Sequence, residues 1–202
     1  ITGNTCMMHF IAGVDTNSIG LAPYVPQFID QKVYTTNDMK MRINKSGSIV
    51  LMPSISAFVG ADIVSGLASL NMPEPIKNYL YVDIGTNGEM ALVTQEKVIC
   101  CATAAGPAFE GANISCGMPA QNGAIDKVTM EGFTTIGDQK PQGLCGSGLI
   151  DLIAILLDKQ IIDSQGIMAE NYILADKNSS DSGKEISLTP DDIREVQLAK
   201  SA

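Results

Sequence analysis

The chain has 202 residues, of which 45% are hydrophobic and 17% are charged, so it can bury a substantial core. Its net charge of −9 argues against nucleic acid or an anionic lipid surface as the main partner. No apolar run is long enough to cross a bilayer, and no basic segment precedes an apolar stretch as in a signal peptide. Five cysteines without a C-x-x-C spacing indicate free thiols in a reducing, cytoplasmic interior.

The first third of the chain predicts a buried helix, a connection, a strand and a second helix. In GNTCMMHFIAG, either Asn4 or Thr5 would cap the first helix and Gly13 would end it. His9 lies in this helix, and a lone histidine among apolar residues is typical of a satisfied core group. The remaining expectations are an irregular connection over 14–35, a strand over 48–52 and a helix over about 57–70.

The middle of the chain predicts β-structure. Apolar runs predict a three-strand meander over 79–84, 89–94 and 97–102. Asn87-Gly88 between two such runs is a strong hairpin signal and would suit a type I′ turn. A Gly-rich region over 103–123 follows, and then come short strands near 124–130 and 133–136.

Two helices dominate the last third. A long, nearly all-apolar helix opens at Gly146 and Ser147, and a polar loop is expected over 176–186. The last helix begins with Thr189 as N-cap and Asp192 as the acid of a capping box. Strands followed by helices suggest an α/β fold, with a mixed sheet and the three-strand meander flanked by helices.

The ends of the chain look cut. Ile1 is not a start methionine, and the last helix reaches Ala202 without a C-terminal stop signal. We therefore expect a piece of a larger protein.

The stretch YLYVDIGTNGE poses the main chemical question. Asp83 ends a buried-strand pattern, and an ionised acid there needs a partner or a cation. The Gly85-Thr86-Asn87-Gly88 run can converge backbone N–H groups on an oxyanion, as a magnesium nucleotide requires. A plain hairpin in which the acid caps the turn explains the same residues, and spacing alone leaves both readings open.

Two further features need explanation. Asp62 lies in an apolar helix, where an acid needs a reason. Gly146, Ser147 and Gly148 open a helix that a phosphate can approach, although ordinary capping with glycines for close packing is favoured by spacing alone. The sequence shows no G-x-S-x-G motif, no oriented Cys/His pair and no Walker loop.

Several phrases together resemble one family, the C-terminal domain of reductive activators of corrinoid proteins. This family belongs to the sugar-kinase, heat-shock-chaperone and actin ATPase superfamily. The resemblance covers nearly the whole chain. The phrases, in order, are GNTCMMHFIAG, LAPYVP, SISAFVGADIVSGL, VDIGTNGEMAL, ATAAGPAFEGANISCGMPAQNGAI, GLCGSGLIDLIA and LTPDDIREVQLAKSA.

The resemblance implies ribonuclease-H-like lobes of the actin-like ATPase fold with ATP in the cleft between them. Residues 1–75 would hold the end of the first lobe plus the connecting helix, and residues 76–202 a second lobe truncated at its C-terminus. The implied activity is ATP hydrolysis coupled to one-electron reduction of cob(II)amide to cob(I)amide. The implied partner is a corrinoid methyltransferase or a corrinoid iron–sulfur protein, and a homodimer is compatible with the family.

Site residues carry over from the matching phrases. DIGTNG resembles the second phosphate loop, which places Asp83, Gly85, Thr86, Asn87 and Gly88 around the phosphates and magnesium. FVGADIVSG resembles the connecting helix, from which Asp62 would reach the magnesium through water. CGSG, with Gly146, Ser147 and Gly148, would lie near the same cleft.

Other parts of the family pattern are missing from this sequence. The first phosphate loop would precede Ile1, the adenosine-contacting motif would follow Ala202, and no iron–sulfur cysteine spacing is present. We therefore expect the electron-donating cluster elsewhere in the polypeptide, and weak or no ATP binding by this fragment alone. The alternatives are a small-metabolite kinase of the same superfamily and a non-catalytic docking module with the same fold.

Overall fold

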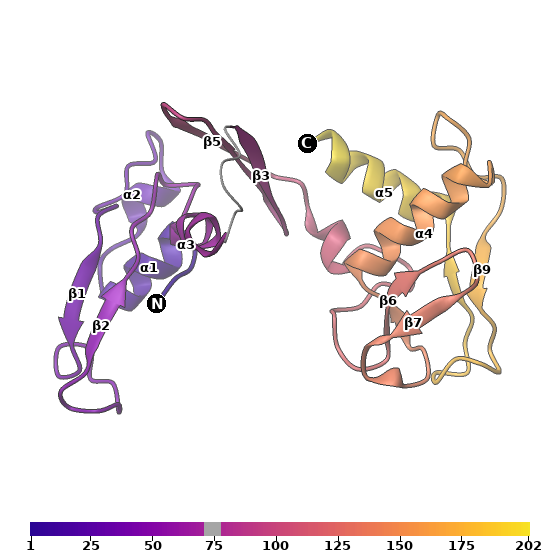
Figure 1. Ribbon diagram of the computed structural model, residues 1–202, viewed down its shortest axis with the longest axis horizontal. Coiled ribbons are helices and arrows are strands. Elements are labelled where there is room, and N and C mark those ends of the chain that lie inside the picture. The colour runs from indigo at the N-terminus through magenta and orange to yellow at the C-terminus, as the bar shows by residue number, and fades with distance from the viewer. Residues whose placement is uncertain (71–77) are drawn as a thin grey trace. The chain divides into compact units, whose positions relative to one another are not determined.

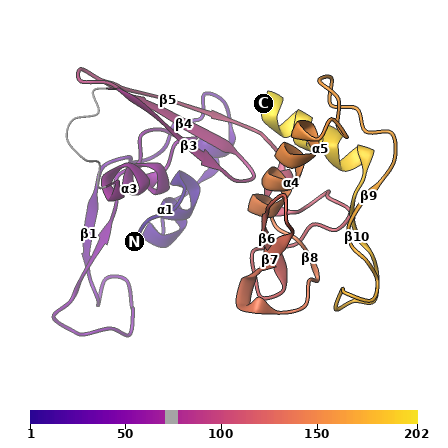
Figure 2. The ribbon, with the colours of Figure 1, turned by 45° about the vertical axis from the view of Figure 1, so that its right-hand side comes forward.

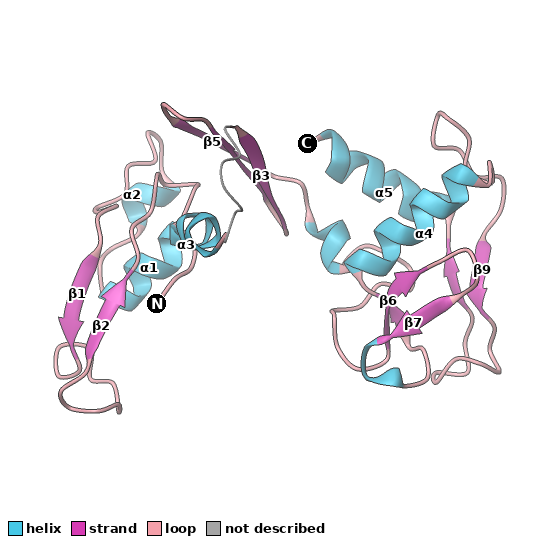
Figure 3. Cartoon of the chain, in the orientation of Figure 1, coloured by secondary structure: helices cyan, strands magenta, loops and turns pink. Residues whose placement is uncertain are grey.

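The computed structural model describes residues 1–70 and 78–202 (Figure 1). The chain divides into two compact units, one made of residues 1–83 and 89–102 and the other of residues 84–88 and 103–202. Helices and strands occur in both units (Figure 3), which agrees with the predicted α/β class. Among the described residues, none of the helices has the length and apolar character of a membrane span.

The first unit begins with α1 (Thr5–Ala12), whose caps follow the sequence prediction. The Asn4 side chain accepts a hydrogen bond from the Met7 N–H, and Gly13 ends the helix in the left-handed conformation. The expected irregular connection is wrong in part, because it contains α2 (Asn17–Gly20) and β1 (Lys32–Thr35). A four-residue strand carries little local signal, and β1 is fixed by antiparallel pairing with β2 (Ser48–Leu51).

The second expected helix is α3 (Ala61–Ser69), which begins about four residues later than predicted. The preceding segment forms a turn instead, in which the N–H groups of Ile55 and Ser56 both donate to the Val59 carbonyl oxygen. Gly60 then serves as the N-cap residue. Competition from this local hydrogen bonding explains the late start of the helix.

Three strands follow: β3 (Tyr79–Ile84), β4 (Gly88–Val93) and β5 (Val98–Thr103), hydrogen-bonded in that order. One face of this sheet packs against α3, where Ile63, Ala91 and Tyr81 belong to one apolar cluster. The opposite face is exposed, since Leu80 retains 60% of its accessible surface. The predicted buried-strand pattern is therefore a half-buried strand in the structure.

The turn between β3 and β4 differs from the expected type. A type I′ turn requires positive φ at both central residues. Neither Asn87 nor Gly88 has a positive φ, and three residues, 85–87, separate the strands. The hairpin prediction is confirmed, but its type I′ geometry is wrong.

The second unit carries a mixed sheet of order β7-β6-β8 (Figure 2). The central strand β6 (Ala124–Val128) pairs antiparallel with β7 (Phe133–Thr135) and parallel with β8 (Gly143–Leu144). A separate antiparallel pair is formed by β9 (Tyr172–Ala175) and β10 (Ile186–Leu188). Two short 3-10 helices, η1 (Pro107–Glu110) and η2 (Ile136–Asp138), lie in the connections.

The core of the second unit is built on α4 (Gly146–Asp158), which starts where the sequence predicted. Leu149, Leu152 and Leu156 are each at most 1% exposed and pack with Ile125 of β6. α5 (Pro190–Ser201) lies beside α4 (Figure 1, Figure 2) and adds its apolar side to the same cluster. Its predicted capping box is present.

Candidate functional site

The loop after Asp83 exposes two polar residues, Thr86 and Asn87. In the described part of the chain, the backbone N–H groups of these two residues donate to no other residue. The Gly85 N–H donates to the Asn87 carbonyl oxygen over 2.9 Å and so helps to shape the turn. Unused N–H groups at a tight turn are what an anion-binding loop offers. The loop therefore keeps the donors that the phosphate prediction requires.

The loop is tied to η1 by two hydrogen bonds. The Thr86 hydroxyl donates to Glu110 Oε2 over 2.5 Å, and the Gly106 N–H donates to the Thr86 carbonyl oxygen over 2.8 Å. Sequence reasoning missed Glu110. Its signal was a single acid between two glycines in GPAFEG, and both glycines, Gly106 and Gly111, have positive φ.

Gly88 closes the loop and is buried at the start of β4. A Cβ atom at this position would come within 3.1 Å of Thr103 Cγ2 on β5. Packing in the sheet is therefore tight at this position, and a side chain there would require Thr103 to shift. A phosphate contact from Gly88 stays a prediction.

Asp83 and Asp62 of the first unit both lie near the side chain of Tyr81. Strand alternation places Tyr81 and Asp83 on the half-buried side of β3. Both Asp83 and Asp62 lie near enough for their charges to act on the Tyr81 phenol. Gly66 of α3 leaves the space for that hydroxyl, because a Cβ there would overlap the oxygen.

The charges of this group change the pKa of Tyr81. Burial raises the pKa of Tyr81, and the negative charges of Asp83 and then Asp62 raise it further, together with the hydrogen bond to Asp83. Sequence reasoning did not single out Tyr81. The two carboxylates predicted to act together on one cation therefore both act on the pKa of one phenol.

Asp62 also has a local structural reason. It lies in the first turn of α3, where a negative charge interacts favourably with the helix dipole. Its Oδ1 accepts from the Ile63 N–H over 2.9 Å, and its own N–H donates to the Gly3 carbonyl oxygen over 3.2 Å. This position accounts for an acid in an apolar helix, so the magnesium role of Asp62 stays a prediction.

The residues present fit a magnesium ion that is shared with a ligand. No group of three or more His, Cys, Asp or Glu side chains that could hold a metal occurs among the described residues. Magnesium commonly keeps several waters and takes only one or two protein carboxylates plus substrate phosphates. Asp62 and Asp83 match that small donor set.

The helix start at Gly146, Ser147 and Gly148 is explained by packing. A Cβ at Gly146 would collide with the Phe109 carbonyl oxygen, and one at Gly148 would collide with the Ile125 carbonyl oxygen. The Ser147 hydroxyl donates to the Asp126 carbonyl oxygen over 2.7 Å. These contacts support the packing alternative. They also place η1 directly against α4, while nucleotide binding by the three residues stays a prediction.

His9 is fully buried, and its ring is satisfied by backbone groups. Nδ1–H donates to the Thr5 carbonyl oxygen over 2.8 Å, and Nε2 accepts from the N–H groups of Gln27 and Phe28 over 3.0 and 3.4 Å. The ring stacks on Phe28 with centroids 4.3 Å apart. The predicted core role is confirmed.

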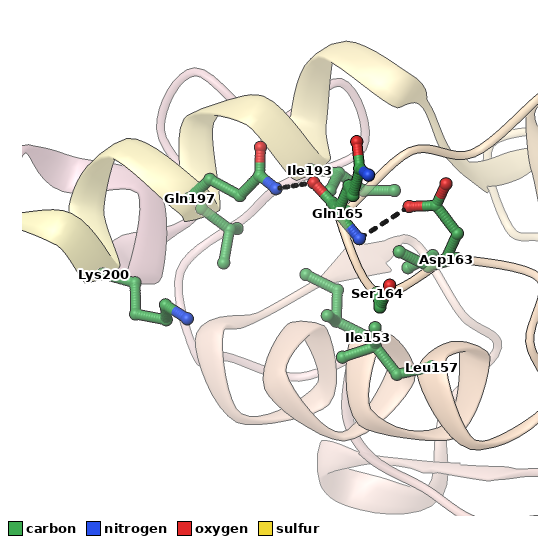
Figure 4. Close-up of a pocket in the computed structure, with 11 residues that line it drawn as sticks. Ile153, Leu157, Asp163, Ser164, Gln165, Ile193, Gln197 and Lys200 are labelled. Atoms are coloured by element: carbon green, nitrogen blue, oxygen red, sulfur yellow. Dashed lines mark hydrogen bonds between the residues drawn. The ribbon is translucent and has the colours of Figure 1, made fainter.

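A pocket of about 260 Å³ lies between the end of α4, α5 and the segment around Asp163 (Figure 4). Several of its polar groups already bind one another: Gln197 Nε2 donates to the Gln165 carbonyl oxygen, and the Gln165 N–H donates to Asp163 Oδ1. None of the predicted site residues lines it. The pocket is therefore separate from the loop after Asp83 and from the two aspartates.

Comparisons with known proteins bear on this site. The family model described as the C-terminal domain of RACo, the ASKHA domain, matches residues 77–202, and the model of the RACo middle region matches residues 1–75. The corrinoid activation enzyme RamQ of Eubacterium limosum is 35% identical over 99% of this chain and 38% of its own length. A reductase of the Co(II) methylated amine-specific corrinoid protein, from Methanosarcina barkeri, is 44% identical over 42% of this chain and 16% of its own length.

The fold has a solved counterpart. A reductive activator for a corrinoid, iron–sulfur protein superposes with a TM-score of 0.85 at 36% identity, covering 100% of this chain and 35% of that one. The chain thus spans little more than a third of RamQ and of this structure. The family match, which covers Asp83 near the end of β3 and the loop that follows, shows that the chain belongs to the RACo family, with residues 77–202 in its ASKHA domain.

Proposed function

We propose that this chain is part of an ATP-dependent reductive activator that returns cob(II)amide to cob(I)amide on a corrinoid protein. The carrying observation is the Asp83 carboxylate at the end of β3, followed at once by a loop whose Thr86 and Asn87 are exposed. The relatives support the redox part of the proposal, since two of them are called a corrinoid activation enzyme and a reductive activator.

In this proposal the chain's own residues bind and orient the nucleotide. The N–H groups of Thr86 and Asn87 hold phosphate oxygens, and Gly85 lets the backbone approach them. Asp83 and Asp62 hold the magnesium ion, in part through water, and the ion neutralises phosphate charge when bound. Tyr81 lies on the same side of β3 as Asp83 and close enough for the Asp83 charge to raise its pKa.

The reduction itself adds one electron to the cobalt of the corrinoid. We propose that this electron comes from an iron–sulfur cluster in another part of the full-length polypeptide. ATP binding and hydrolysis would favour the conformation in which transfer occurs, through different affinities for the two states. The partner is a corrinoid methyltransferase or a corrinoid iron–sulfur protein.

The finer architecture belongs to the same proposal. Residues 1–75 contribute the end of a first ribonuclease-H-like lobe and its connecting helix, and residues 76–202 belong to the second lobe. The proposed location is the cytoplasm, and the five free cysteines support it. The proposed assembly is a homodimer.

Asp83→Asn in the full-length protein tests the proposal. The assay follows the ATP-dependent appearance of the cob(I)amide absorbance on the partner protein. We expect a fall in rate of at least about tenfold, because loss of one charged hydrogen-bonding group costs on the order of 1.5–3 kcal/mol. Asp30→Asn, which changes an exposed acid of the same unit, is the matched control.

Three results would count against the proposal. A wild-type rate in Asp83→Asn would remove Asp83 from the site. ATP-dependent phosphorylation of a small metabolite without cobalt reduction would favour the kinase alternative. Binding of the corrinoid protein without any ATP turnover by wild type would favour the docking alternative.

A further inference from the structure

Glu110 is an acidic side chain hydrogen-bonded to the proposed phosphate loop, and it has no part in the function proposed above. Its carboxylate accepts the Thr86 hydroxyl proton in a hydrogen bond of 2.5 Å. Its other oxygen lies 3.5 Å from where a Cβ on Gly85 would be. A negative charge held against a loop that should bind phosphates calls for an explanation, since like charges repel.

The direction of the hydrogen bond between Thr86 and Glu110 suggests an explanation. A threonine hydroxyl has one proton to donate and two lone pairs that accept. Because the hydroxyl hydrogen is engaged in the hydrogen bond to Glu110, the Thr86 oxygen can offer only its lone pairs to a ligand. Lone pairs suit a hard cation and not a phosphate oxygen. The Glu110 carboxylate next to that oxygen also prefers a hard cation to a phosphate.

We propose that Glu110 is a positioning residue of the nucleotide site, which orients the Thr86 hydroxyl so that its lone pairs favour the magnesium-bound nucleotide over the free nucleotide. This inference rests on the proposed function. It assigns to the Thr86 side chain a role toward the cation, while the backbone N–H groups of the loop serve the phosphates.

The backbone around Glu110 is built to hold this arrangement. Thr86 is held at both ends of η1. The Gly106 N–H, just before η1, donates to the Thr86 carbonyl oxygen, and Glu110, the last residue of η1, accepts from the Thr86 hydroxyl. Gly111 ends η1 at φ +84°, and a Cβ there would lie 2.6 Å from the Met118 nitrogen. Phe109 rests against Gly146 of α4. The side chain of Glu110 is exposed, yet both ends of η1 are fixed by close backbone contacts.

The test measures nucleotide affinity of the full-length protein by calorimetry, with ATP in excess magnesium and with ATP in a chelator. Glu110→Ala should weaken binding of magnesium ATP about tenfold, the size expected for a lost charge-assisted contact. The same variant should bind magnesium-free ATP as well as wild type or better, because a like charge has been removed. Glu110→Gln, which keeps an acceptor without the charge, should fall between the two.

A merely structural role predicts something different, namely equal weakening of both forms of ATP. That result would overturn the proposal, and so would an unchanged affinity for magnesium ATP. Tighter binding of both forms would mean that Glu110 only competes with phosphate, which also contradicts it. Glu170→Ala, at an exposed acid of the same unit, controls for net charge.

A double-mutant cycle tests whether Glu110 acts through Thr86. Thr86→Val should weaken magnesium ATP binding, Thr86→Ser should retain it, and Glu110→Ala/Thr86→Val should bind like Thr86→Val alone. Additive losses would show that Glu110 acts independently and would overturn the positioning role. If wild-type protein binds neither form of ATP, the proposed function fails and not merely the role of Glu110.

Discussion

Asp192 joins a helix cap to a distant loop, and this double role leads to a sharp prediction. Its Oδ2 accepts from the Thr189 N–H over 2.8 Å, which completes the capping box of α5. Its Oδ1 accepts from both the N–H and the hydroxyl of Ser115, over 2.7 and 3.0 Å. Asp192 itself is 1% exposed, so water does not compete for its carboxylate oxygens.

The expected magnitudes differ between the two cap residues. Thr189→Ala removes one side-chain acceptor and should cost about 1 kcal/mol. Asp192→Ala removes the charged acceptor of two part-buried backbone N–H groups, those of Ser115 and Thr189. Hydrogen bonds to a charged group contribute about 1.5–3 kcal/mol each, so we expect a loss of about 3–5 kcal/mol in total. Asp192→Asn keeps one acceptor oxygen and should cost about half as much.

Hydrogen exchange read by mass spectrometry is the suitable assay, because a multidomain protein does not unfold in two states. Asp192→Ala should reduce amide protection in both the 112–118 and the 189–201 segments by at least about a hundredfold, while Thr189→Ala should affect mainly the latter. If Asp192→Ala loosens α5 but leaves the segment around Ser115 protected, Asp192 is only a local cap and the reasoning is refuted.

Two other predictions concern Tyr81. Gly66→Ala should destabilise α3 by about 1–2 kcal/mol despite the better helix propensity of alanine, because the new Cβ overlaps the Tyr81 hydroxyl. Tyr81→Phe should recover part of that loss in exchange measurements on 61–70, and a more stable Gly66→Ala protein would contradict the contact. Because the pKa of Tyr81 is raised in the folded protein, its contribution to stability should be present below the ordinary tyrosine pKa of about 10 and lost as pH rises beyond it. In an ultraviolet titration of the phenol, Asp83→Asn should lower the Tyr81 pKa more than Asp62→Asn does, and the reverse order would refute the assigned causes.

The fold was predictable wherever the signal was local. The caps of α1 and α5 and the first residue of α4 follow from residues within one helical turn of each end, so they could be placed from sequence. The strands β1, β8, β9 and β10 have four residues or fewer and were missed. Strands this short are stabilised largely by their pairing partners, and a local pattern revealed only some of them, such as β2 and β7.

The candidate site divides in the same way. Asp83 and the loop 85–88 were found because an acid after an apolar run is locally anomalous. Tyr81 looked like one more apolar strand residue, and Glu110 like one more acid in a Gly-rich connection. Their roles depend on contacts across the sequence, such as the 24-residue separation between Thr86 and Glu110.

By itself, the sequence determined the caps of α1 and α5, the start of α4, the β3–β4 hairpin, the buried state of His9 and the family, since each is written in short-range patterns or contiguous phrases. Only the tertiary structure decided the turn geometry, the role of Gly146 and Gly148 as contacts for carbonyl oxygens, and the pairing of Thr86 with Glu110. The physical reason is that close approach of two backbones, and the burial that makes a hydrogen bond matter, exist only after distant segments have packed.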